Sequence, residues 1–488
     1  MSSATAYPGA DSDRRWRRLV YPADYRNPRP RGRYHLIVIG AGPAGLVTAI
    51  AAAGLGARVA LIERGAMGGD CLNVGCVPSK ALLEFTKERA HTDCFEEAFE
   101  WLRAVRAKIA EHDSVERYVA AGVDVYLGAA RFVSGDTVEI EGVSLSARRI
   151  VIATGARAAL PPIPGLAQAR PLTNETVFDL RERPRRLAII GGGPIGSELA
   201  QAFARMNVEV QLFEMADRVL ALETREAGEI VTRALERSGV QLHLNATVER
   251  VERRGAEVVV TANGAETTAD ELLVAAGRRA NSDGLDLELA GVQTGPGGLV
   301  VVDDYLRTTN RRVYAAGDVC ARLQFTHNAD SHARIVVQNA LFVPTATTRK
   351  LVVPHCSYTD PEVAQVGRSQ AELERDGTSF ETWRVGFGDL DRGRVQGDDS
   401  GFAEVLAAPK DGRILGATIV GRDAGEQLAP LCVAMTNGLG LGRLARTVLP
   451  YPTRSEYLRR MADEFNRKRL TPSARRLFAA WFKWNMRP

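Results

Sequence analysis

The chain has 488 residues, of which 45% are hydrophobic and 25% charged, the proportions of a globular protein with about three or four domains. It contains no run of eighteen or more apolar residues, so we expect a cytoplasmic protein without a membrane span. Six cysteines are too few for a secreted disulfide scaffold, and a net charge of +4 gives no reason to expect nucleic-acid binding.

Residues 1–33 form a basic N-terminal arm, with eight Arg against three Asp. Residues 456–488 are basic too, with nine Lys or Arg against three acids, so both ends flank an acidic body. These patterns favour solvated charged tails, with contacts to anionic surfaces as the alternative. The arm has no apolar stretch typical of a secretory signal, and its acids and prolines argue against an amphipathic helix.

A short apolar run at residues 35–39 predicts a buried strand, which the glycine-rich turn GAGPAG follows. A helix and a second strand ending at Glu63 come next. Glycines in such a turn let backbone N–H groups approach a pyrophosphate, and the acid can hold a ribose hydroxyl. The turn therefore predicts a dinucleotide site, with glycines Gly40, Gly42 and Gly45.

The same unit returns in LAIIGGGPIGSELAQAFARMNVEVQLFE, where the strand ends at Glu214. Its glycines are Gly191, Gly193 and Gly196. A carboxylate at the end of this strand accepts hydrogen bonds from a free 2′-hydroxyl and repels a 2′-phosphate, so we expect NADH over NADPH, although Arg218 lies close by in the sequence. Two dinucleotide sites in one chain predict an enzyme that passes electrons between two cofactors.

Three further apolar segments end in small residues and predict strands that deliver glycine backbone to the carboxyl edge of a parallel sheet. They are RIVIATGA (149–156), ELLVAAGRRAN (271–281) and RVYAAGDV (312–319). In the last, Asp318 can accept a hydrogen bond from a ribityl or ribose hydroxyl, or it can be an ordinary turn residue.

The segment GGDCLNVGCVPSK places Cys71 and Cys76 five positions apart. A zinc site needs more ligands than this pair, and the nearest candidates, His91 and Cys94, are expected on a surface helix. A structural disulfide is unusual in a reducing compartment, so a redox pair is the preferred interpretation. Cys76 precedes a predicted helix, whose N-terminus stabilises a thiolate, whereas Asp70 raises the pKa of the neighbouring Cys71.

These motifs, in this order, resemble the flavin-dependent pyridine nucleotide-disulfide oxidoreductases, which include lipoamide dehydrogenase, glutathione reductase and mercuric reductase. The likeness covers roughly residues 34–465, and the combination of motifs is specific. It implies a homodimer with FAD at the first site and NAD(P)H at the second. The expected fold is α/β, with two Rossmann-like dinucleotide-binding domains, for FAD and NAD(P), and a C-terminal α+β dimerisation domain.

The resemblance also implies roles for individual residues. Cys76 would be the thiol beside the flavin and Cys71 the outer thiol that attacks the acceptor, while Lys80 would pair with Glu198. The FAD contacts would be Gly40, Gly42, Gly45, Glu63, Lys80, Ala130 and Asp318. The nicotinamide nucleotide contacts would be Gly193, Gly196, Glu214 and Gly277.

Residues 325–342 resemble the family helix whose N-terminus points at the flavin. His327 and His332 on this segment are candidate proton donors, although packing or solvation is the expected role of both.

The stretch LPYPTRSE departs from the His-Pro-x-x-x-Glu motif of the family's disulfide reductases. In those enzymes the His, supplied by the other subunit, serves the outer thiol as acid and base. Here Tyr451 stands in its place and Glu456 is kept. A tyrosine with an ordinary pKa of about 10 is not a base at neutral pH, so exchange with glutathione or lipoamide is disfavoured. Mercuric reductases also carry Tyr there, but they add a C-terminal cysteine pair that the ending WFKWNMRP lacks.

The basic, aromatic segment 471–488 predicts an amphipathic helix, with Leu477, Phe478, Trp481 and Phe482 beside Arg475, Arg476 and Lys483. It can lie on an anionic membrane surface or pack on the dimer. The predicted domains are the arm at 1–33, the FAD domain at 34–160 and 280–351, the NAD(P)H domain at 161–279, the dimerisation domain at 352–470 and this tail.

We therefore expect an enzyme that passes electrons from NAD(P)H through FAD to a redox-active Cys71–Cys76 disulfide, and then to a small-molecule or disulfide acceptor that the sequence does not identify. No resident metal is expected. One alternative is mercuric reductase-like reduction of a thiophilic metal or soft electrophile. An alternative of another class is a flavoprotein redox sensor or a membrane-associated adaptor, since fold alone does not decide function.

Overall fold

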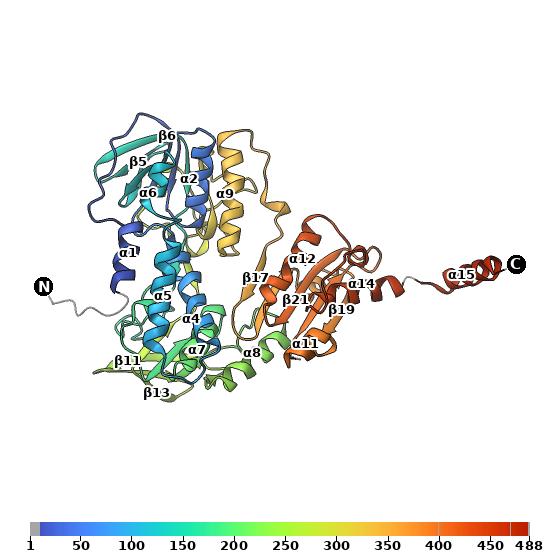
Figure 1. Cartoon of the computed structure of the whole chain (residues 1–488). Coiled ribbons are helices and arrows are strands. Elements are labelled where there is room, and N and C mark those ends of the chain that lie inside the picture. Colours follow the sequence, from blue (N-terminus) through green and yellow to red (C-terminus); the bar gives the residue numbers. More distant parts are fainter. Residues whose placement is uncertain (1–9, 399, 469, 487–488) are drawn as a thin grey trace. The chain divides into compact units, whose positions relative to one another are not determined.

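The computed structural model describes residues 10–398, 400–468 and 470–486, which form two compact units (Figure 1). The first unit takes in residues 1–221 and 232–351, and the second takes in residues 222–231 and 352–488. Both units combine helices with β-sheets, which confirms the predicted α/β class. The boundaries expected between an FAD domain and an NAD(P)H domain stay a prediction.

A seven-stranded sheet forms the core of the first unit, with strand order β3-β2-β1-β6-β5-β4 and with β16 against β6. The ladders among β1, β2, β3, β6 and β16 are parallel, whereas β4 and β5 pair in an antiparallel way. Because Ile39 pairs with both Ile62 and Ile152, these strands end at one edge of the sheet. The strands are β1 (Tyr34–Ile39), β2 (Val59–Glu63), β3 (Asp124–Leu127), β4 (Ala130–Ser134), β5 (Thr137–Ile140), β6 (Val143–Ile152) and β16 (Val313–Ala315).

Two helices lie side by side on this sheet, α2 (Pro43–Gly54) in blue and α9 (Thr326–Leu341) in yellow (Figure 1). Buried alanines on both helices, Ala44, Ala49 and Ala329 among them, allow the close packing. The helix expected within residues 325–342 is thus present as α9. Its N-terminus and that of α2 both follow strands of the sheet, β16 and β1, so both start near its carboxyl edge.

A second parallel sheet in the first unit repeats this arrangement, with strand order β10-β9-β8-β14. Its strands are β8 (Arg186–Ile190), β9 (Glu209–Phe213), β10 (Gln241–His243) and β14 (Glu271–Val274). Helix α7 (Pro194–Arg205) follows β8 in the way that α2 follows β1. The remaining strands form small antiparallel sheets: β11 (Val248–Arg254), β12 (Glu257–Ala262) and β13 (Ala265–Ala269) in one, and β7 (Ala156–Ala158) with β15 (Arg278–Ala280) in the other.

The cysteine segment consists of two short, consecutive helices. Helix α3 (Gly69–Val74) contains Cys71, and α4 (Cys76–Lys87) begins at Cys76. Gly75 separates the two helices with φ −135° and ψ −116°. The start of α4 agrees with the prediction, whereas α3 was not expected as a separate helix. The helices that follow are α5 (Phe95–Ile109) and α6 (Val115–Ala120).

The N-terminal arm contains a helix, which corrects the expectation of a solvated tail. Helix α1 (Ala10–Val20) lies beside α5 (Figure 1). Val20 is fully buried, and Trp16 and Leu19 pack against the core of the first unit. The acids and arginines of the segment lie around this apolar stripe and do not prevent the helix, because they pair with charges on neighbouring elements. Residues 1–9 of the arm lie outside the described residues.

The second unit is built on an antiparallel sheet with strand order β17-β18-β21-β20-β19. Its strands are β17 (Pro354–Ser357), β18 (Glu362–Gly367), β19 (Glu381–Gly386), β20 (Phe402–Ala407) and β21 (Ile414–Gly421). Its core includes apolar residues of α12 and α14, such as Leu428 and Met461. The helices are α10 (Gln370–Arg375), α11 (Asp391–Gln396), α12 (Ala424–Thr436), α13 (Leu441–Leu444), α14 (Glu456–Lys468) and α15 (Pro472–Asn485), while α8 (Arg225–Arg237) is divided between the units.

Helix α15 confirms that the C-terminal segment is helical, although residues 487–488 lie outside the described residues. All of its large apolar side chains are exposed. Within residues 10–398, 400–468 and 470–486, no helix combines the length and the apolar character that crossing a bilayer requires.

Candidate active site

The first glycine turn joins β1 to α2 and fits a pyrophosphate. A Cβ on Gly45 would lie 1.8 Å from the carbonyl oxygen of Gly40, so only glycine permits this tight turn. Gly42 has no side chain to cap α2, which leaves the first-turn N–H groups available to an anion. Glu63 closes the turn by accepting hydrogen bonds from the N–H groups of Ala41 (2.6 Å) and Gly65 (2.7 Å). Burial raises the pKa of Glu63.

The second glycine turn, between β8 and α7, has the same geometry. A Cβ on Gly196 would lie 1.9 Å from the Gly191 carbonyl oxygen, whereas one on Gly193 would meet nothing within 4 Å. The open space at Gly193 is where backbone can approach a pyrophosphate. Glu214 accepts hydrogen bonds from Gly192 (2.6 Å) and Ala216 (2.8 Å).

Arg218 makes its hydrogen bonds within the loop that follows Glu214. Its guanidinium donates to Asp217 Oδ1 at 2.8 Å and to the carbonyl oxygen of Ala221 at 3.0 Å. The side chain is 15% exposed. These contacts hold it against the loop that follows Glu214, so it is not an extended cation reaching for a 2′-phosphate.

The cysteine segment packs directly on the first glycine turn. A Cβ on Gly69, at the start of α3, would lie 2.5 Å from the Cα of Gly42. The N–H of Gly68 donates to the carbonyl oxygen of Ala41 at 2.8 Å. The two cysteines therefore stand beside the N-terminus of α2, in the same unit as the turn that fits FAD.

Cys71 and Cys76 are both free thiols in this structure, Cys71 half-buried and Cys76 exposed. A hydrogen bond from the Cys71 thiol lowers the pKa of Cys76 to about 6, and the same contact raises the pKa of Cys71. Burial and the charge of Asp70 also raise the pKa of Cys71. Cys76 is thus the thiolate at neutral pH and Cys71 the protonated thiol.

Two further groups stabilise the Cys76 thiolate. Thr326, the first residue of α9, places its Oγ1 3.5 Å from Cys76 Sγ, and this contact lowers the thiol pKa. The positive charge of Lys80 also lowers it. Lys80 Nζ lies 2.6 Å from Oε2 of Glu198, which is almost fully buried on α7. The structure therefore brings together the pair that the family resemblance implied.

Asp70 is held by residues that the sequence did not point to. Its carboxylate accepts hydrogen bonds from Arg278 Nη2 (2.5 Å) and Asn174 Nδ2 (2.9 Å). Arg278 also lies 3.7 Å from Asp318. Since Arg278, Asn174 and Thr326 come from segments far from the cysteines in sequence, only the tertiary fold reveals them.

The other predicted cofactor contacts lie at strand ends. Ala130 begins β4 and is buried, and Gly277, with φ 127°, lies between β14 and β15 with open space at its Cβ position. Asp318 follows β16, and burial raises its pKa. These positions suit a bound nucleotide, and the individual contacts stay predictions.

The two histidines of α9 have different surroundings. His332 is 6% exposed and accepts a hydrogen bond at Nδ1 from the N–H of Gly317 (3.3 Å). Burial lowers its pKa to about 4. His327 is exposed and stacks on Phe325, with 5.4 Å between ring centroids.

The expectation that His91 and Cys94 share a surface helix is wrong. Helix α4 ends at Lys87, and His91 lies beyond it with φ 62°, in the left-handed region. Cys94 is buried immediately before α5.

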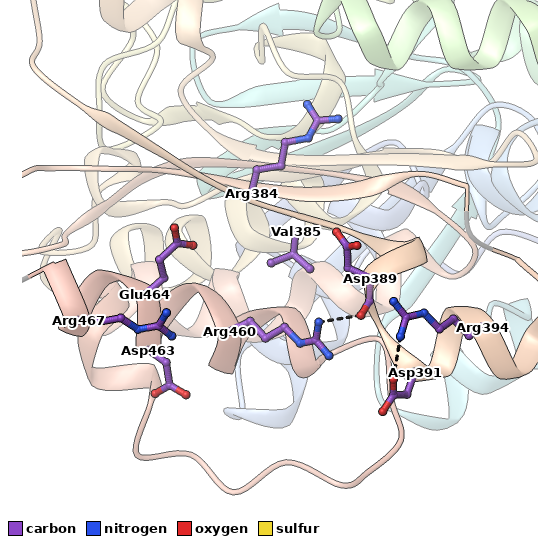
Figure 2. A pocket seen from close by; sticks show the side chains of 9 residues that line it. All are labelled: Arg384, Val385, Asp389, Asp391, Arg394, Arg460, Asp463, Glu464 and Arg467. Atoms are coloured by element: carbon purple, nitrogen blue, oxygen red, sulfur yellow. Dashed lines mark hydrogen bonds and ion pairs between the residues drawn. The ribbon is translucent and has the colours of Figure 1, made fainter.

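Tyr451 lies in the second unit and is 71% exposed. Its hydroxyl donates to Asp391 Oδ2 at 2.6 Å, and this hydrogen bond raises the pKa of the phenol. Asp391 also lines a surface pocket of about 590 Å³ (Figure 2). Arg460, on the pocket wall, donates to the Asp389 carbonyl oxygen (2.7 Å) and to Glu456 (2.9 Å). The pocket has both signs of charge, and Tyr451 stands next to it.

Comparisons with known proteins agree with this architecture. Residues 34–333 match the pyridine nucleotide-disulphide oxidoreductase family, and residues 353–462 match its dimerisation domain, which supports a homodimer. A mercuric reductase of Bacillus cereus is 36% identical over 444 residues, covering 87% of this chain and 70% of that protein. A dihydrolipoyl dehydrogenase of Bacillus subtilis is 32% identical over 453 residues, covering 88% of this chain and 95% of that protein.

A solved structure, the HOCl-induced flavoprotein disulfide reductase RclA from Escherichia coli, aligns with a TM-score of 0.82 and 31% identity. The alignment covers 88% of this chain and 99% of that one. The family resemblance and the cofactors predicted from the sequence are therefore confirmed. The chain belongs to the pyridine nucleotide-disulphide oxidoreductase family and is an FAD- and NAD(P)H-dependent disulfide oxidoreductase.

Proposed function

We propose that this enzyme uses NADH to reduce a thiophilic metal ion bound by Cys71 and Cys76. The observation that carries the proposal is Tyr451, bound to Asp391, at the position where the family's disulfide reductases have their acid–base histidine. The similarity to a mercuric reductase over most of the chain is in line with it.

The choice of acceptor follows from the protonation of Cys71. To attack a disulfide, this thiol must lose a proton, and Cys76, burial and Asp70 all raise its pKa. Tyr451 is no base at neutral pH, because its hydrogen bond to Asp391 raises an already high pKa. A metal ion needs no such base, since coordination deprotonates a thiol directly.

Three residues prepare the thiols for this task. Thr326 and Lys80 hold Cys76 as a thiolate, and Glu198 fixes Lys80. Bound FAD supplies a two-electron carrier between the nicotinamide nucleotide and the cysteine pair. The half-buried Cys71 then provides the second sulfur ligand for the ion.

The preference for NADH rests on Glu214 and Arg218. The Glu214 carboxylate repels a 2′-phosphate, and Arg218 is bound to Asp217 and Ala221.

In the homodimer, we propose that Tyr451 of one subunit reaches the cysteine pair of the other and donates a hydrogen bond there.

The reaction balances without a further reactant. One NADH gives up two electrons and releases one proton to solvent, and the two electrons take one divalent ion to the metal or two divalent ions to the monovalent state. The electrons leave the cysteine pair as a disulfide, which the next NADH reduces through FAD.

The test is anaerobic NADH oxidation by the holoenzyme with Hg²⁺ or Cu²⁺ as acceptor, compared with glutathione disulfide and lipoamide. We expect metal-dependent turnover that Cys71→Ser and Cys76→Ser each abolish. Cys432→Ser, a half-buried cysteine of the second unit, is the matched control and should keep activity. Metal-dependent turnover that survives loss of both Cys71 and Cys76, or faster turnover with a disulfide, would contradict the proposal. If no acceptor supports NADH oxidation, a flavoprotein redox sensor without sustained turnover becomes the preferred function.

We also propose that α15 binds an anionic membrane surface. Its aromatic and aliphatic side chains recur at helical spacing and are roughly half to two-thirds exposed, while its basic residues lie on the other side of the helix. The rings of Trp481 and Trp484 contact each other, with 5.1 Å between their centroids. The exposed side chains are Leu477, Phe478, Trp481, Phe482 and Trp484.

Vesicle co-sedimentation tests this second proposal. We expect binding to phosphatidylglycerol-containing vesicles, weaker binding at high salt, and little binding to pure phosphatidylcholine. Trp481→Ala with Phe482→Ala should lower binding, whereas Trp101→Ala, which removes an exposed tryptophan of α5, should not. Binding that persists after deletion of residues 471–488 would overturn it.

A further inference from the structure

We infer that Trp16, on the N-terminal helix α1, is a positioning residue for the redox-active cysteine pair. The connection runs through Asn73, which lies between Cys71 and Cys76 on α3. Trp16 Nε1 donates a hydrogen bond to Asn73 Oδ1 at 2.8 Å. Asn73 is 6% exposed, so its amide oxygen has little access to solvent.

Asn73 in turn holds the backbone that carries Cys71. Its Nδ2 donates to the carbonyl oxygens of Gly69 (2.8 Å) and Met67 (3.1 Å), at and just before the start of α3. The orientation of one buried amide therefore determines how the first turn of α3 is held. Without the indole donor, the amide loses the partner that fixes this orientation.

A second link from α1 reaches Asn73 through Arg106 of α5. Asp13 lies 2.9 Å from Arg106 Nη2, and Nη1 of Arg106 donates to the backbone carbonyl oxygen of Asn73 at 3.2 Å. The guanidinium lies over the Trp16 ring, 4.3 Å from its centroid, and the Arg106 side chain is 3% exposed. Asp13 also pairs with Arg181 at 2.6 Å.

The C-terminal end of α1 supplies a third contact. The carbonyl oxygen of Val20 accepts a hydrogen bond from the N–H of Met67 at 3.1 Å, and both residues are fully buried. Helix α1 thus holds the cysteine segment before α3 at Met67 and within α3 at Asn73. Two direct hydrogen bonds and one link through Arg106 of α5 therefore join α1 to this short segment.

These contacts fix the backbone of α3 between Cys71 and Cys76. A disulfide requires a sulfur–sulfur distance of about 2.05 Å and a specific dihedral angle, so the equilibrium between dithiol and disulfide depends on how α3 is held relative to the start of α4. Helix α1 therefore helps to set the ratio of dithiol to disulfide, whichever acceptor the enzyme serves.

The experiment compares Trp16→Phe with the unchanged enzyme as FAD-bound holoenzyme. Phenylalanine keeps a ring against Arg106 but removes the N–H group that donates a hydrogen bond to Asn73. The protein is equilibrated anaerobically in buffers of reduced and oxidised dithiothreitol, quenched with acid and alkylated. Mass spectrometry of the 71–76 peptide then gives the ratio of dithiol to disulfide.

We expect the ratio to change about tenfold at the same buffer potential, equivalent to about 30 mV for a two-electron couple. Asp13→Asn, which weakens the Arg106 contact without touching the ring, should shift the ratio in the same direction and serves if Trp16→Phe fails to fold. Trp101→Phe, at an exposed tryptophan of the same unit, is the control and should leave the ratio unchanged.

A ratio that is unchanged in folded Trp16→Phe and Asp13→Asn would overturn the inference. This holds even if both variants melt at a lower temperature, because a purely structural helix would stabilise the two redox states equally. The readout does not involve an acceptor, so its failure is separate from failure of the proposed metal reduction.

Discussion

The hydroxyl of Tyr451 donates to Asp391 at 2.6 Å, while Glu456, five residues later, is bound by Arg460. Oε2 of Glu456 is buried, and no group among the described residues donates a hydrogen bond to it. The carboxylate that the family motif keeps is therefore not the partner of the tyrosine.

Restoring the imidazole should change the choice of acceptor. We expect Tyr451→His to raise NADH oxidation with glutathione disulfide or lipoamide by about 10²-fold, because general acid–base catalysis then becomes possible at neutral pH. Metal-dependent turnover should change much less. Tyr451→Phe removes the bond to Asp391 without adding a base, so it should show no gain. Equal disulfide turnover in the unchanged enzyme and in Tyr451→His would contradict this explanation.

The Cys76 thiolate should titrate near pH 6. Contacts with Cys71, Thr326 and Lys80 lower the pKa of this thiol to about 6, so the thiolate is present above that pH and is lost below it. In enzyme that has taken up two electrons, the long-wavelength absorption of a thiolate beside FAD should follow the same curve. A midpoint near the ordinary thiol pKa of about 8.5 would show that these contacts do not act on Cys76.

Replacing Lys80 should affect both stability and the thiol. Lys80→Met removes the cation beside Glu198, a carboxylate 2% exposed, and should lower the free energy of unfolding by about 2–3 kcal/mol, since Lys80 itself is partly exposed. It should also move the Cys76 midpoint to higher pH, because Lys80 favours the thiolate. Lys80→Arg keeps the charge and should show smaller changes in both. Denaturant unfolding and the pH dependence of the absorption band measure the two effects.

Nucleotide preference tests the role of Glu214. We expect kcat/KM for NADH to exceed that for NADPH at least about tenfold, and Glu214→Gln to reduce this ratio by about tenfold through loss of the charge that repels a 2′-phosphate. Arg218→Met should leave the ratio unchanged, since Arg218 is bound to Asp217 and Ala221. If Arg218→Met changes the NADH to NADPH ratio of kcat/KM and Glu214→Gln does not, Arg218 is the residue that discriminates between the two nucleotides.

The features that the sequence predicted are those encoded by neighbouring residues. Each glycine turn, with its helix and the acid at the end of the next strand, lies within about 30 residues, as a βαβ unit does. Cys76 at the start of a helix is a local feature as well. For these elements the pattern of glycine and apolar residues was enough.

The features that were missed depend on contacts between distant segments. Thr326 and Arg278 reach the cysteine segment only because β16 and β15 bring them there. Helix α3 has six residues and glycines on both sides, so its sequence is too short to show the apolar periodicity of a helix. In α1 the arginines dominate the composition, and the apolar stripe of Trp16, Leu19 and Val20 is too short to predict its burial.

An anaerobic titration of the oxidised holoenzyme with NADH tests most directly whether the cysteine pair is a second redox centre. We expect uptake of about four electrons per FAD, with the long-wavelength absorption present after about the first two. Cys71→Ser should reduce the uptake to about two electrons. Uptake of about two electrons by the unchanged enzyme, without the absorption band, would contradict the account and assign the chemistry to the flavin alone.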